Sequence, residues 1–305
     1  MSAAAFIAVD WGTSNARFAL CDDAARALEV REGPGAAQAR GKFAQAFDEA
    51  TAGWRGTHGE LPAFMCGMVG SAFGWLEAPY LPCPADLYEL AESSVPIRAG
   101  VHVAPGMRCT NPLGAPDVMR GEETQLLGAL CLGNLSKSGR QLACLPGTHT
   151  KWVSLSGGVV QEFLTAPTGE IFALLCEHSV LVRDKATPLT HSPKDFERGL
   201  AEAVRHPGAF LHQIFQARSL RLDKQLSAEG AASWASGLLI GADVGGALTM
   251  FAAQDDAPVL VIGTPKLTES YALALARRGR QAIQVDGAQA ALAGLGNIFQ
   301  ERQRK

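Results

Sequence analysis

Two short polar turns, each directly after an apolar run of strand length, carry the residue types that bind phosphate groups. The first turn, residues 10–17, reads Asp-Trp-Gly-Thr-Ser-Asn-Ala-Arg. The backbone N–H groups and hydroxyls of Gly12, Thr13 and Ser14 can face phosphate oxygens. Asp10 can hold Mg²⁺, because hard cations prefer oxygen ligands. An ordinary hairpin with a surface aspartate is the alternative, although a carboxylate that ends an apolar strand needs partners.

The second turn, residues 145–151, reads Leu-Pro-Gly-Thr-His-Thr-Lys. Gly147 and Thr148 would form a second phosphate-binding loop. His149 is either a ligand of the nucleotide or a plain turn residue, and Lys151 either meets a phosphate or lies on a strand edge. One glycine turn is weak evidence, since such turns occur in most α/β proteins. Two turns at matching places in the chain indicate a single nucleotide gripped from two sides.

An acidic segment, residues 117–125, reads Asp-Val-Met-Arg-Gly-Glu-Glu-Thr-Gln. Apolar residues at helical spacing predict a helix over 118–135 with Asp117 as its N-cap. Acids at a helix start favour the positive end of its dipole, so capping alone would explain them. The functional interpretation makes Glu122 a general base that takes a proton from a hydroxyl attacking phosphorus. Asp117 and Glu123 stay open as alternative bases.

Two further loops complete the candidate site. The loop at 67–75, Gly-Met-Val-Gly-Ser-Ala-Phe-Gly-Trp, lets the backbone pass close to a ligand, and its Ser71 and Trp75 could contact a polyol together with Asn15 and Arg17 of the first turn. A rigid loop bounded by prolines is equally consistent with this segment.

Residues 259–265, Val-Leu-Val-Ile-Gly-Thr-Pro, form a buried strand that ends at glycine before a helix. An adenine can lie against backbone at such a place, so Gly263 and Thr264 are candidate nucleotide contacts. A plain strand-to-helix turn would look the same.

The elements that must position these residues follow an α/β pattern. Apolar runs predict a hairpin over 5–9 and 16–21 and a third strand at 28–31. A helix that carries Phe43, Phe47 and Trp54 on one face comes next. The later predictions are strands at 63–66, 141–145, 151–155, 159–164, 258–262 and 281–285, and helices at 169–182, 194–205, 207–219, 227–253, 266–278 and 288–299. Because the hairpin-plus-third-strand unit occurs twice, we expect two similar lobes joined near residue 130.

Composition narrows the class of protein. Of the 305 residues, 47% are hydrophobic and 19% charged, which excludes a disordered chain and a fibre. A net charge of −3 without a basic cluster argues against nucleic-acid binding. Seven cysteines without a C-x-x-C pair argue against a disulfide framework and a zinc site, and favour the cytoplasm. The apolar stretch 236–253 contains Asp243, so we interpret it as a buried helix and expect no membrane span.

The chain also lacks the signatures of several common enzyme classes. It has no G-x-x-x-x-G-K-[ST], no complete G-x-G-x-x-G and no G-x-S-x-G. P-loop nucleotide hydrolases, dinucleotide-dependent enzymes and α/β-hydrolases therefore lose their main sequence support.

Taken together, six blocks resemble the 2-dehydro-3-deoxygalactonokinase family, which belongs to the actin-like ATPase superfamily. In chain order they are DWGTSNAR, GMVGS, PDVMRGEETQLLGA, LPGTHTKWV, TGEIFALL and SGLLIGAD, which span residues 10 to 243. The PDVMRGEETQ block is the most specific of them.

The resemblance implies an α/β fold of two ribonuclease H-like lobes with a cleft between them. An N-terminal lobe, 1–130, would hold the sugar acid and the first phosphate loop, and a C-terminal lobe, 131–305, the second phosphate loop and adenosine. It implies MgATP as cofactor and phosphorylation of 2-dehydro-3-deoxy-D-galactonate on its 6-hydroxyl, a step of galactonate catabolism. The partner is then a small sugar acid, and a homodimer is allowed.

Individual roles carry over from the resemblance at the matching positions. Asp10 matches the metal-associated acid, Gly147 and Thr148 match the second phosphate loop, and Gly263 with Thr264 falls at the adenosine loop. Glu122 resembles the base in the Gly-Asp-Gln block of glycerol kinase and its relatives.

Two alternatives to this function stay open. One is a kinase for another sugar or sugar acid, because the fold and the phosphate loops are shared and only the lobe-one loops choose the acceptor. The other is a non-catalytic actin-like protein that binds ATP without transferring phosphate.

Overall fold

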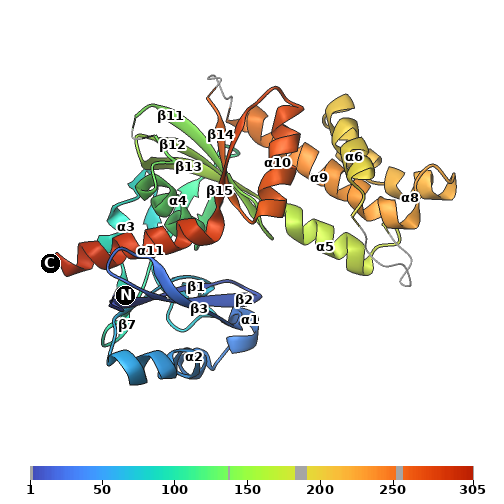
Figure 1. Ribbon diagram of the computed structural model, residues 1–305. Coiled ribbons are helices and arrows are strands. Elements are labelled where there is room, and N and C mark those ends of the chain that lie inside the picture. The colour runs from blue at the N-terminus through green and yellow to red at the C-terminus, as the bar shows by residue number, and fades with distance from the viewer. Residues whose placement is uncertain (1–2, 137, 183–190, 252–256, 305) are drawn as a thin grey trace. The chain divides into compact units, whose positions relative to one another are not determined.

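The computed structural model describes residues 3–136, 138–182, 191–251 and 257–304. Its first sheet contains the expected hairpin and four further strands, in the order β3-β2-β1-β4-β8-β7 (Figure 1). The strands are β1 Phe6–Trp11, β2 Asn15–Cys21, β3 Ala27–Pro34, β4 Ala63–Gly67, β7 Val95–Arg98 and β8 Val101–Val103. β1 pairs with β2 antiparallel and with β4 parallel, and β4 pairs with β8 parallel. Short β7 and β8 are additions that the sequence analysis did not anticipate.

Both faces of this sheet are covered by helices, which explains the continuous apolar run of β1. Ile7, Val9 and Trp11 point to the side of helix α2, Phe43–His58. On the other side the Phe6 ring stacks on Phe299 of helix α11, Gly287–Gln303, with ring centroids 4.4 Å apart. Figure 1 shows α2 below and α11 above the strands. Helix α11 comes from the end of the chain, yet it packs on β1, β4 and helix α4.

A small second sheet corrects the prediction for residues 116–135. It has the order β10-β9-β5, with β10 Pro116–Met119, β9 Gly106–Thr110 and β5 Tyr80–Pro82. Asp117 therefore lies on a strand, and its prediction as a helix N-cap is wrong. Helix α4, Glu122–Cys131, begins only after Gly121, whose φ of +107° no helix can contain. The alternation of exposed Val118 and buried Met119 is a strand pattern that helical spacing concealed.

The third sheet repeats the strand order of the first. It runs β15-β14-β11-β12-β13-β6, so β13-β12-β11-β14-β15 mirrors β3-β2-β1-β4-β8. The strands are β11 Arg140–Leu145, β12 Thr150–Ser156, β13 Val159–Ala166, β14 Val259–Gly263, β15 Ala282–Asp286 and β6 Ala85–Asp86. This repeated order confirms the α/β class and the duplicated unit that the sequence predicted.

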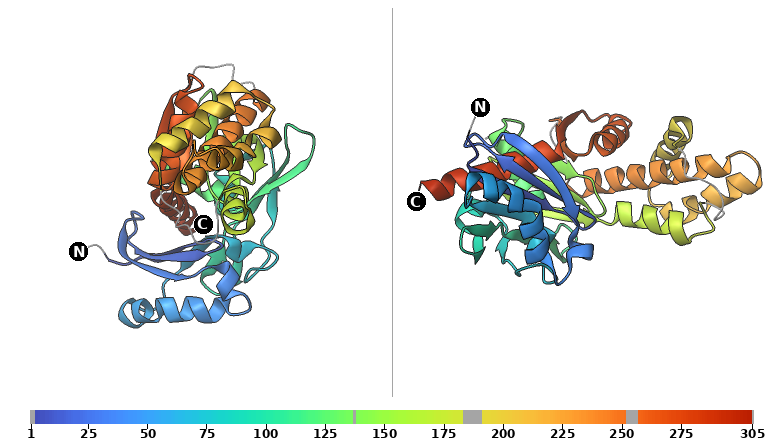
Figure 2. Two further views of the ribbon diagram at one scale, coloured as in Figure 1. Left: turned by 90° about the vertical axis from the view of Figure 1, so that its right-hand side faces the viewer. Right: turned by 60° about the horizontal axis from the view of Figure 1, so that its bottom comes forward.

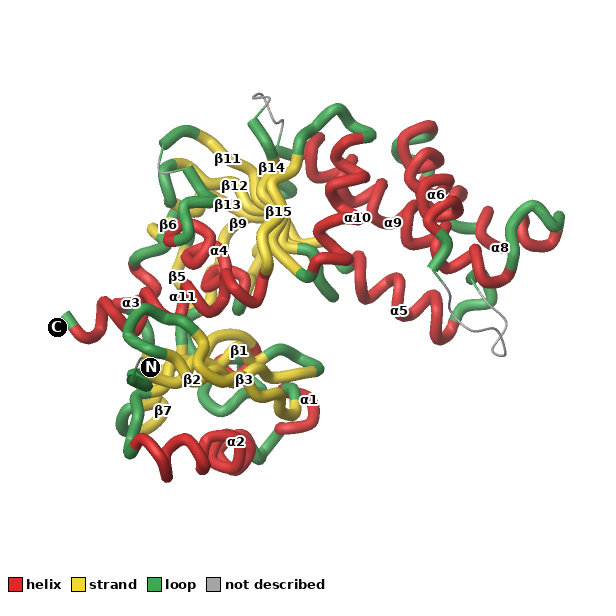
Figure 3. The backbone as a smooth tube through the Cα atoms, viewed as in Figure 1, coloured by secondary structure: helices red, strands yellow, loops and turns green. Residues whose placement is uncertain are grey.

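The remaining helices lie mostly between β13 and β14 in the chain. They are α1 Ala36–Ala39, α3 Glu89–Glu92, α5 Thr168–His178, α6 Pro193–Arg205, α7 Phe210–Gln213, α8 Gln216–Leu222, α9 Ala228–Met250 and α10 Pro265–Ala276, with a 3-10 turn, η1, at Met68–Gly70. Helices α5, α6 and α8 pack along α9, as Figures 2 and 3 show. The helix expected over 207–219 is divided into α7 and α8. Residues 252 and 253, the end of another expected helix, lie outside the described residues.

The chain forms two compact units. Unit 1 consists of residues 1–141, 154–163 and 285–305, and unit 2 of residues 142–153 and 164–284. Chain order alone would not give these units, because the last residues belong to the first. The functional division into lobes 1–130 and 131–305 stays a prediction. Among the described residues, no helix has the length and apolar character that crossing a membrane requires.

Candidate active site

In unit 1, Asp10 lies at the end of β1 beside the end of β4. The two strands are parallel, and their register places Asp10 opposite Cys66. The Cys66 thiol approaches Asp10 Oδ1 at 3.7 Å. Burial raises the pKa of the Asp10 carboxyl, and contact with the thiol and the charge of Arg17 partly oppose this rise. Arg17 is the cross-strand partner of Asp10 on β2.

The turn after Asp10 is fastened to the start of helix α1. The carbonyl oxygens of Gly12 and Thr13 accept hydrogen bonds from the N–H groups of Ala36 and Ala37, at 2.9 and 3.1 Å. Thr13 and Ser14 are exposed, whereas Gly12 is half-buried. With two carbonyls directed at α1, the turn has a fixed shape, and its exposed residues are accessible to a ligand.

At the start of α4, two adjacent carboxylates have opposite environments. Glu123 has 0% exposure, and both its oxygens accept the Gly121 N–H at 2.8 Å. Burial, with a smaller contribution from the charge of Glu122, raises the Glu123 pKa from 4.5 to about 7. Glu122 is only half-buried, and its Oε2 accepts the Arg120 N–H at 3.0 Å. One acid is therefore enclosed and the other is within reach of a ligand.

Close backbone contact brings this helix start to the end of β4. A β-carbon at Gly121 would lie 3.2 Å from the Gly67 Cα, so the two glycines pack directly on each other. The pKa of the Cys66 thiol is raised well above its ordinary value by burial and by the negative charges of Asp10 and Glu123. Asp10 and Glu123, which are more than 110 residues apart in the sequence, thus both lie near the buried Cys66 thiol.

Sequence reasoning missed Cys66. The sequence did contain a signal for it. Cys66 ends an apolar run, and if that run pairs in parallel with β1, its end must lie beside Asp10. Thr124 was also missed; its hydroxyl donates to Glu123 Oε1 at 3.2 Å.

Asp117 makes two local hydrogen bonds around the small sheet. Its Oδ1 accepts the Val118 N–H at 2.8 Å, and its Oδ2 accepts from the Asn111 amide at 3.4 Å. The structure brings Glu123 and Asp10 to the same buried thiol, and it places Asp117 on strand β10 of the small sheet.

The residues expected to bind the sugar acid have different surroundings. Asn15 and Arg17 are exposed on β2. The Ser71 hydroxyl donates to the Met68 carbonyl at 2.8 Å, which fixes the loop after β4. The Trp75 ring packs against Phe47, with centroids 5.7 Å apart, and so belongs partly to the core. The substrate contacts of all four residues stay predictions.

Unit 2 contains a second convergence of loops, built on the same strand relation. β11 and β14 are parallel neighbours, so the turns that follow them lie at one edge of the sheet. A β-carbon at Gly263 would lie 3.3 Å from the Pro146 ring, whereas one at Gly147 would meet open space. Thr264 is exposed at the N-cap of α10. The predicted phosphate and adenosine loops of this unit are therefore adjacent.

The turn after β11 is also held by the first residues of α5. The Glu170 N–H donates to the Thr148 carbonyl at 3.0 Å, and the Glu170 carboxylate lies 2.8 Å from His149 Nε2. Lys151 lies on β12, mostly buried, and its ammonium donates to the Thr165 hydroxyl at 2.9 Å. His149 remains exposed beside the turn, whereas Lys151 takes part in strand-to-strand contacts.

Comparison with known proteins identifies the family. The family model described as 2-keto-3-deoxy-galactonokinase matches residues 10–298. The chain belongs to this kinase family. It is 36% identical to the 2-dehydro-3-deoxygalactonokinase of Escherichia coli strain K12, over 97% of both chains. It is 34% identical to a probable enzyme of the same name from Rhizobium meliloti strain 1021, over 95% of both chains.

Solved structures agree with this assignment. A crystal structure from Sinorhizobium meliloti, described as that of a 2-dehydro-3-deoxygalactonokinase, superimposes with a TM-score of 0.88 at 32% identity, covering 97% of this chain and 99% of that one. The activator of 2-hydroxyisocaproyl-CoA dehydratase from Clostridium difficile, with bound ADPNP, gives 0.52 at 8% identity, covering 98% and 96%, and so shares the fold alone. The repeated strand order agrees with the α/β fold of two similar halves that the sequence predicted.

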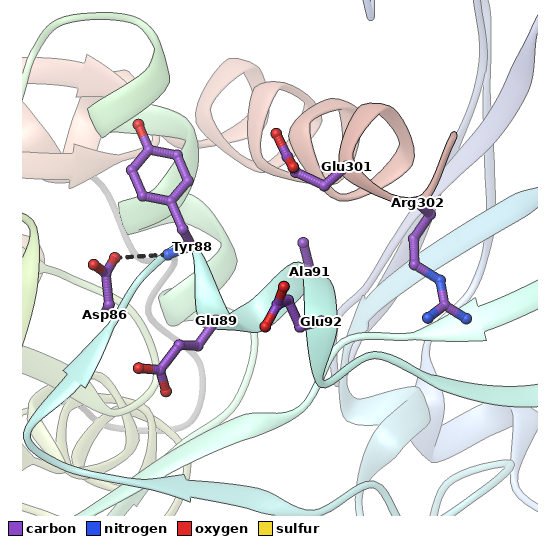
Figure 4. A pocket seen from close by; sticks show the side chains of 7 residues that line it. All are labelled: Asp86, Tyr88, Glu89, Ala91, Glu92, Glu301 and Arg302. Carbon is purple, nitrogen blue, oxygen red and sulfur yellow. Dashed lines mark hydrogen bonds between the residues drawn. The ribbon is translucent and has the colours of Figure 1, made fainter. Parts of the chain in front are cut away.

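This kinase also has an acidic hollow in unit 1, between α3 and α11 (Figure 4). Its volume is about 280 Å³, and four carboxylates line it against the single guanidinium of Arg302. The carboxylates belong to Asp86, Glu89, Glu92 and Glu301. A polyphosphate would be repelled there.

Proposed function

We propose that the chain transfers the γ-phosphoryl group of ATP to the 6-hydroxyl of 2-dehydro-3-deoxy-D-galactonate. Membership of the family supports the reaction. The observation that carries the mechanism is the half-buried carboxylate of Glu122 at the start of α4, in the segment that packs on the end of β4 beside Asp10. The bond from O6 to the γ-phosphorus forms, the bond from that phosphorus to the β,γ-bridging oxygen breaks, and ADP leaves.

Glu122 is the proposed general base. A base must come within hydrogen-bond reach of the hydroxyl that it deprotonates, and Glu122 is accessible whereas Glu123 is not. The proton of the 6-hydroxyl passes to a carboxylate oxygen of Glu122 as O6 attacks. Glu123 instead holds the Gly121 N–H and fixes the entry to the helix.

The nucleotide would be held by three loops. Residues 12–14 supply the first phosphate loop, residues 147–149 the second, and residues 263–264 the adenosine loop. In unit 2 the last two loops adjoin through the contact of Gly263 with Pro146. That residues 12–14 grip the same nucleotide is the central hypothesis of the proposal.

Magnesium fits this site through a single protein ligand. No group of three or more His, Cys, Asp or Glu side chains that could hold a metal occurs in the part of the chain that the structure describes. Mg²⁺ usually takes only one or two carboxylates and completes its shell with water and phosphate oxygens. The Asp10 carboxylate is half-buried at the strand end and would hold the ion. When bound, the ion neutralises charge on the phosphates.

The sugar acid would lie beside β2 and the loop after β4. Arg17 is exposed, and a guanidinium binds a carboxylate in bidentate fashion. Asn15, Ser71 and Trp75 complete the proposed contacts. A cytoplasmic location is part of the proposal, and a homodimer is compatible with it.

A coupled assay for ADP tests the reaction. We expect Glu122→Gln to lower kcat by about 10²-fold or more while calorimetric binding of MgATP changes little. Turnover of Glu122→Gln equal to that of the original protein would remove Glu122 from the mechanism.

The same assay across acceptors tests the substrate. 2-Keto-3-deoxygalactonate, its gluconate epimer and neutral hexoses would be compared at equal concentration. Preference for a neutral hexose would overturn the assignment of the acceptor. ATP binding without turnover on any acceptor would favour the non-catalytic alternative.

A further inference from the structure

A carboxylate in unit 2 lies outside the machinery described so far. Asp243 projects from the middle of α9 and accepts three side-chain hydrogen bonds. Its Oδ1 accepts from Trp152 Nε1 at 2.8 Å, and its Oδ2 accepts from the hydroxyls of Thr168 and Tyr271 at 2.7 and 2.6 Å. We propose that Asp243 is a positioning residue that sets the second phosphate loop, residues 147–149, through two separate connections. The inference rests on the proposed role of that loop in nucleotide binding.

The first connection runs through the start of α5. Thr168, the first residue of that helix, is bonded to Asp243, and Gly169 follows it. A β-carbon at Gly169 would overlap the Gly147 carbonyl oxygen and lie 3.0 Å from the Thr148 Cα. Since the Glu170 N–H also donates to the Thr148 carbonyl, the first turn of α5 touches the loop along its backbone. The hydrogen bond between Thr168 and Asp243 therefore also fixes the position of the loop.

The second connection reaches the other end of the loop. The Tyr271 hydroxyl lies 2.8 Å from the Thr150 hydroxyl, and Thr150 begins β12 directly after His149. Thr150, Tyr271 and Thr168 are buried, and Asp243 is half-buried. One carboxylate is thus linked both to the helix start that contacts Gly147 and Thr148 and to Thr150, which follows the loop.

An ionised carboxylate suits this task because it can only accept hydrogen bonds. The Tyr271 hydroxyl donates to Asp243 and lies within hydrogen-bond distance of the Thr150 hydroxyl. Burial raises the pKa of Asp243, and the hydrogen bonds from Tyr271, Thr168, Trp152 and Thr150 lower it. Removing a donor weakens the network without leaving an empty cavity, provided that the replacement has the same shape.

The functional consequence is selective. The network touches the nucleotide side of the protein, whereas the proposed sugar-acid contacts lie in unit 1. A loop displaced by about 1 Å can cost up to about 10²-fold in rate. We therefore expect disruption of the network to weaken nucleotide binding and to leave the apparent affinity for the sugar acid unchanged.

Thr168→Val is the test variant, because valine keeps the shape of threonine and lacks its hydroxyl. We expect its KM for ATP and its calorimetric Kd for ADP to rise about tenfold, the loss of one hydrogen bond to a charged group. The KM for the sugar acid should stay within about twofold. Thr168→Ser keeps the hydroxyl and should restore nucleotide affinity.

The matched control is Thr51→Val. The Thr51 hydroxyl is also fully buried and donates to the Phe47 carbonyl at 2.8 Å, but it lies on α2 in unit 1. A similar loss of thermal stability without a change in ADP affinity is expected. Tyr271→Phe, which removes a different donor, repeats the test should Thr168→Val not fold.

Several results would overturn the inference. They are an unchanged Kd for ADP in Thr168→Val and Tyr271→Phe, an equal rise of both KM values, or the same nucleotide defect in Thr51→Val. The proposed function fails in a different way. If the unmodified protein binds ADP but phosphorylates no acceptor, the kinase assignment fails, while the Kd series still decides the role of Asp243.

Discussion

The buried acid Glu123 makes the stability of the protein depend on pH in a direction opposite to that of most carboxylates. Its pKa is about 7 in the folded protein, whereas the ordinary value of a glutamate, 4.5, applies to the unfolded chain. Between these values the folded state binds more protons than the unfolded state, so the contribution of Glu123 to stability is fully present below about pH 4.5 and is lost as the pH rises through 7. At about 1.4 kcal/mol per pH unit, the whole contribution amounts to about 3.5 kcal/mol.

Glu123→Gln removes this titration while keeping the shape and one acceptor for the Gly121 N–H. The free energy of unfolding would be measured by urea denaturation at several values between pH 5.5 and 8. Because the pKa values of Asp10 and Asp243 are also raised by burial, the informative quantity is the difference between the two proteins at each pH. Between pH 5.5 and 8, the variant should gain about 2 kcal/mol in free energy of unfolding relative to the original protein.

A control variant distinguishes the effect of burying a carboxylate from the effect of losing one negative charge. Glu269→Gln removes an exposed carboxylate from α10, and its difference from the original protein should stay nearly constant. A constant difference for Glu123→Gln as well would refute the reasoning, since Glu123 would then titrate as an ordinary surface acid.

The other predictions replace single glycines by alanine, in close backbone contacts and, for comparison, in open space. Gly128→Ala should destabilise the protein by about 2 to 3 kcal/mol, because its new methyl would overlap the Ala290 carbonyl oxygen where α4 meets α11; urea denaturation measures the loss, and a neutral result would refute the contact. Gly56→Ala, in an open stretch of α2, should instead raise stability by about 0.5 to 1 kcal/mol. Gly169→Ala should displace the Gly147 turn and raise the Kd for ADP about tenfold or more by calorimetry, and unchanged affinity would contradict the proposed packing.

Local patterns predicted much of the fold. The hairpin β1–β2 and the strands after residue 140 follow from apolar runs ended by glycine turns, and the structure has them within a few residues. The pattern failed at residues 116–121, where Val118 and Met119 fit both a helix and a strand. A positive φ at Gly121 decides between them, and the sequence cannot reveal a φ value.

The sequence offered candidate residues for the site but not their arrangement. It named Asp10 at the end of an apolar strand and Glu122 and Glu123 at the start of a helix, and their roles stay predictions. It could not distinguish Glu122 from Glu123, since only burial separates them. Asp243 was noticed only as an interruption of an apolar helix. Its three donors come from three other elements, and such long-range contacts leave no local pattern.

Helix α11 has a consequence for how the protein is made on the ribosome. Phe299 stacks on Phe6, nearly 300 residues before it in the chain, and α11 also packs against α4. During synthesis the first sheet therefore has one apolar face uncovered until the residues of α11 have left the ribosome. Helix α4 acquires its final packing at the same stage. A message that stops before α11 would yield a chain whose first strands stay exposed to chaperones and proteases.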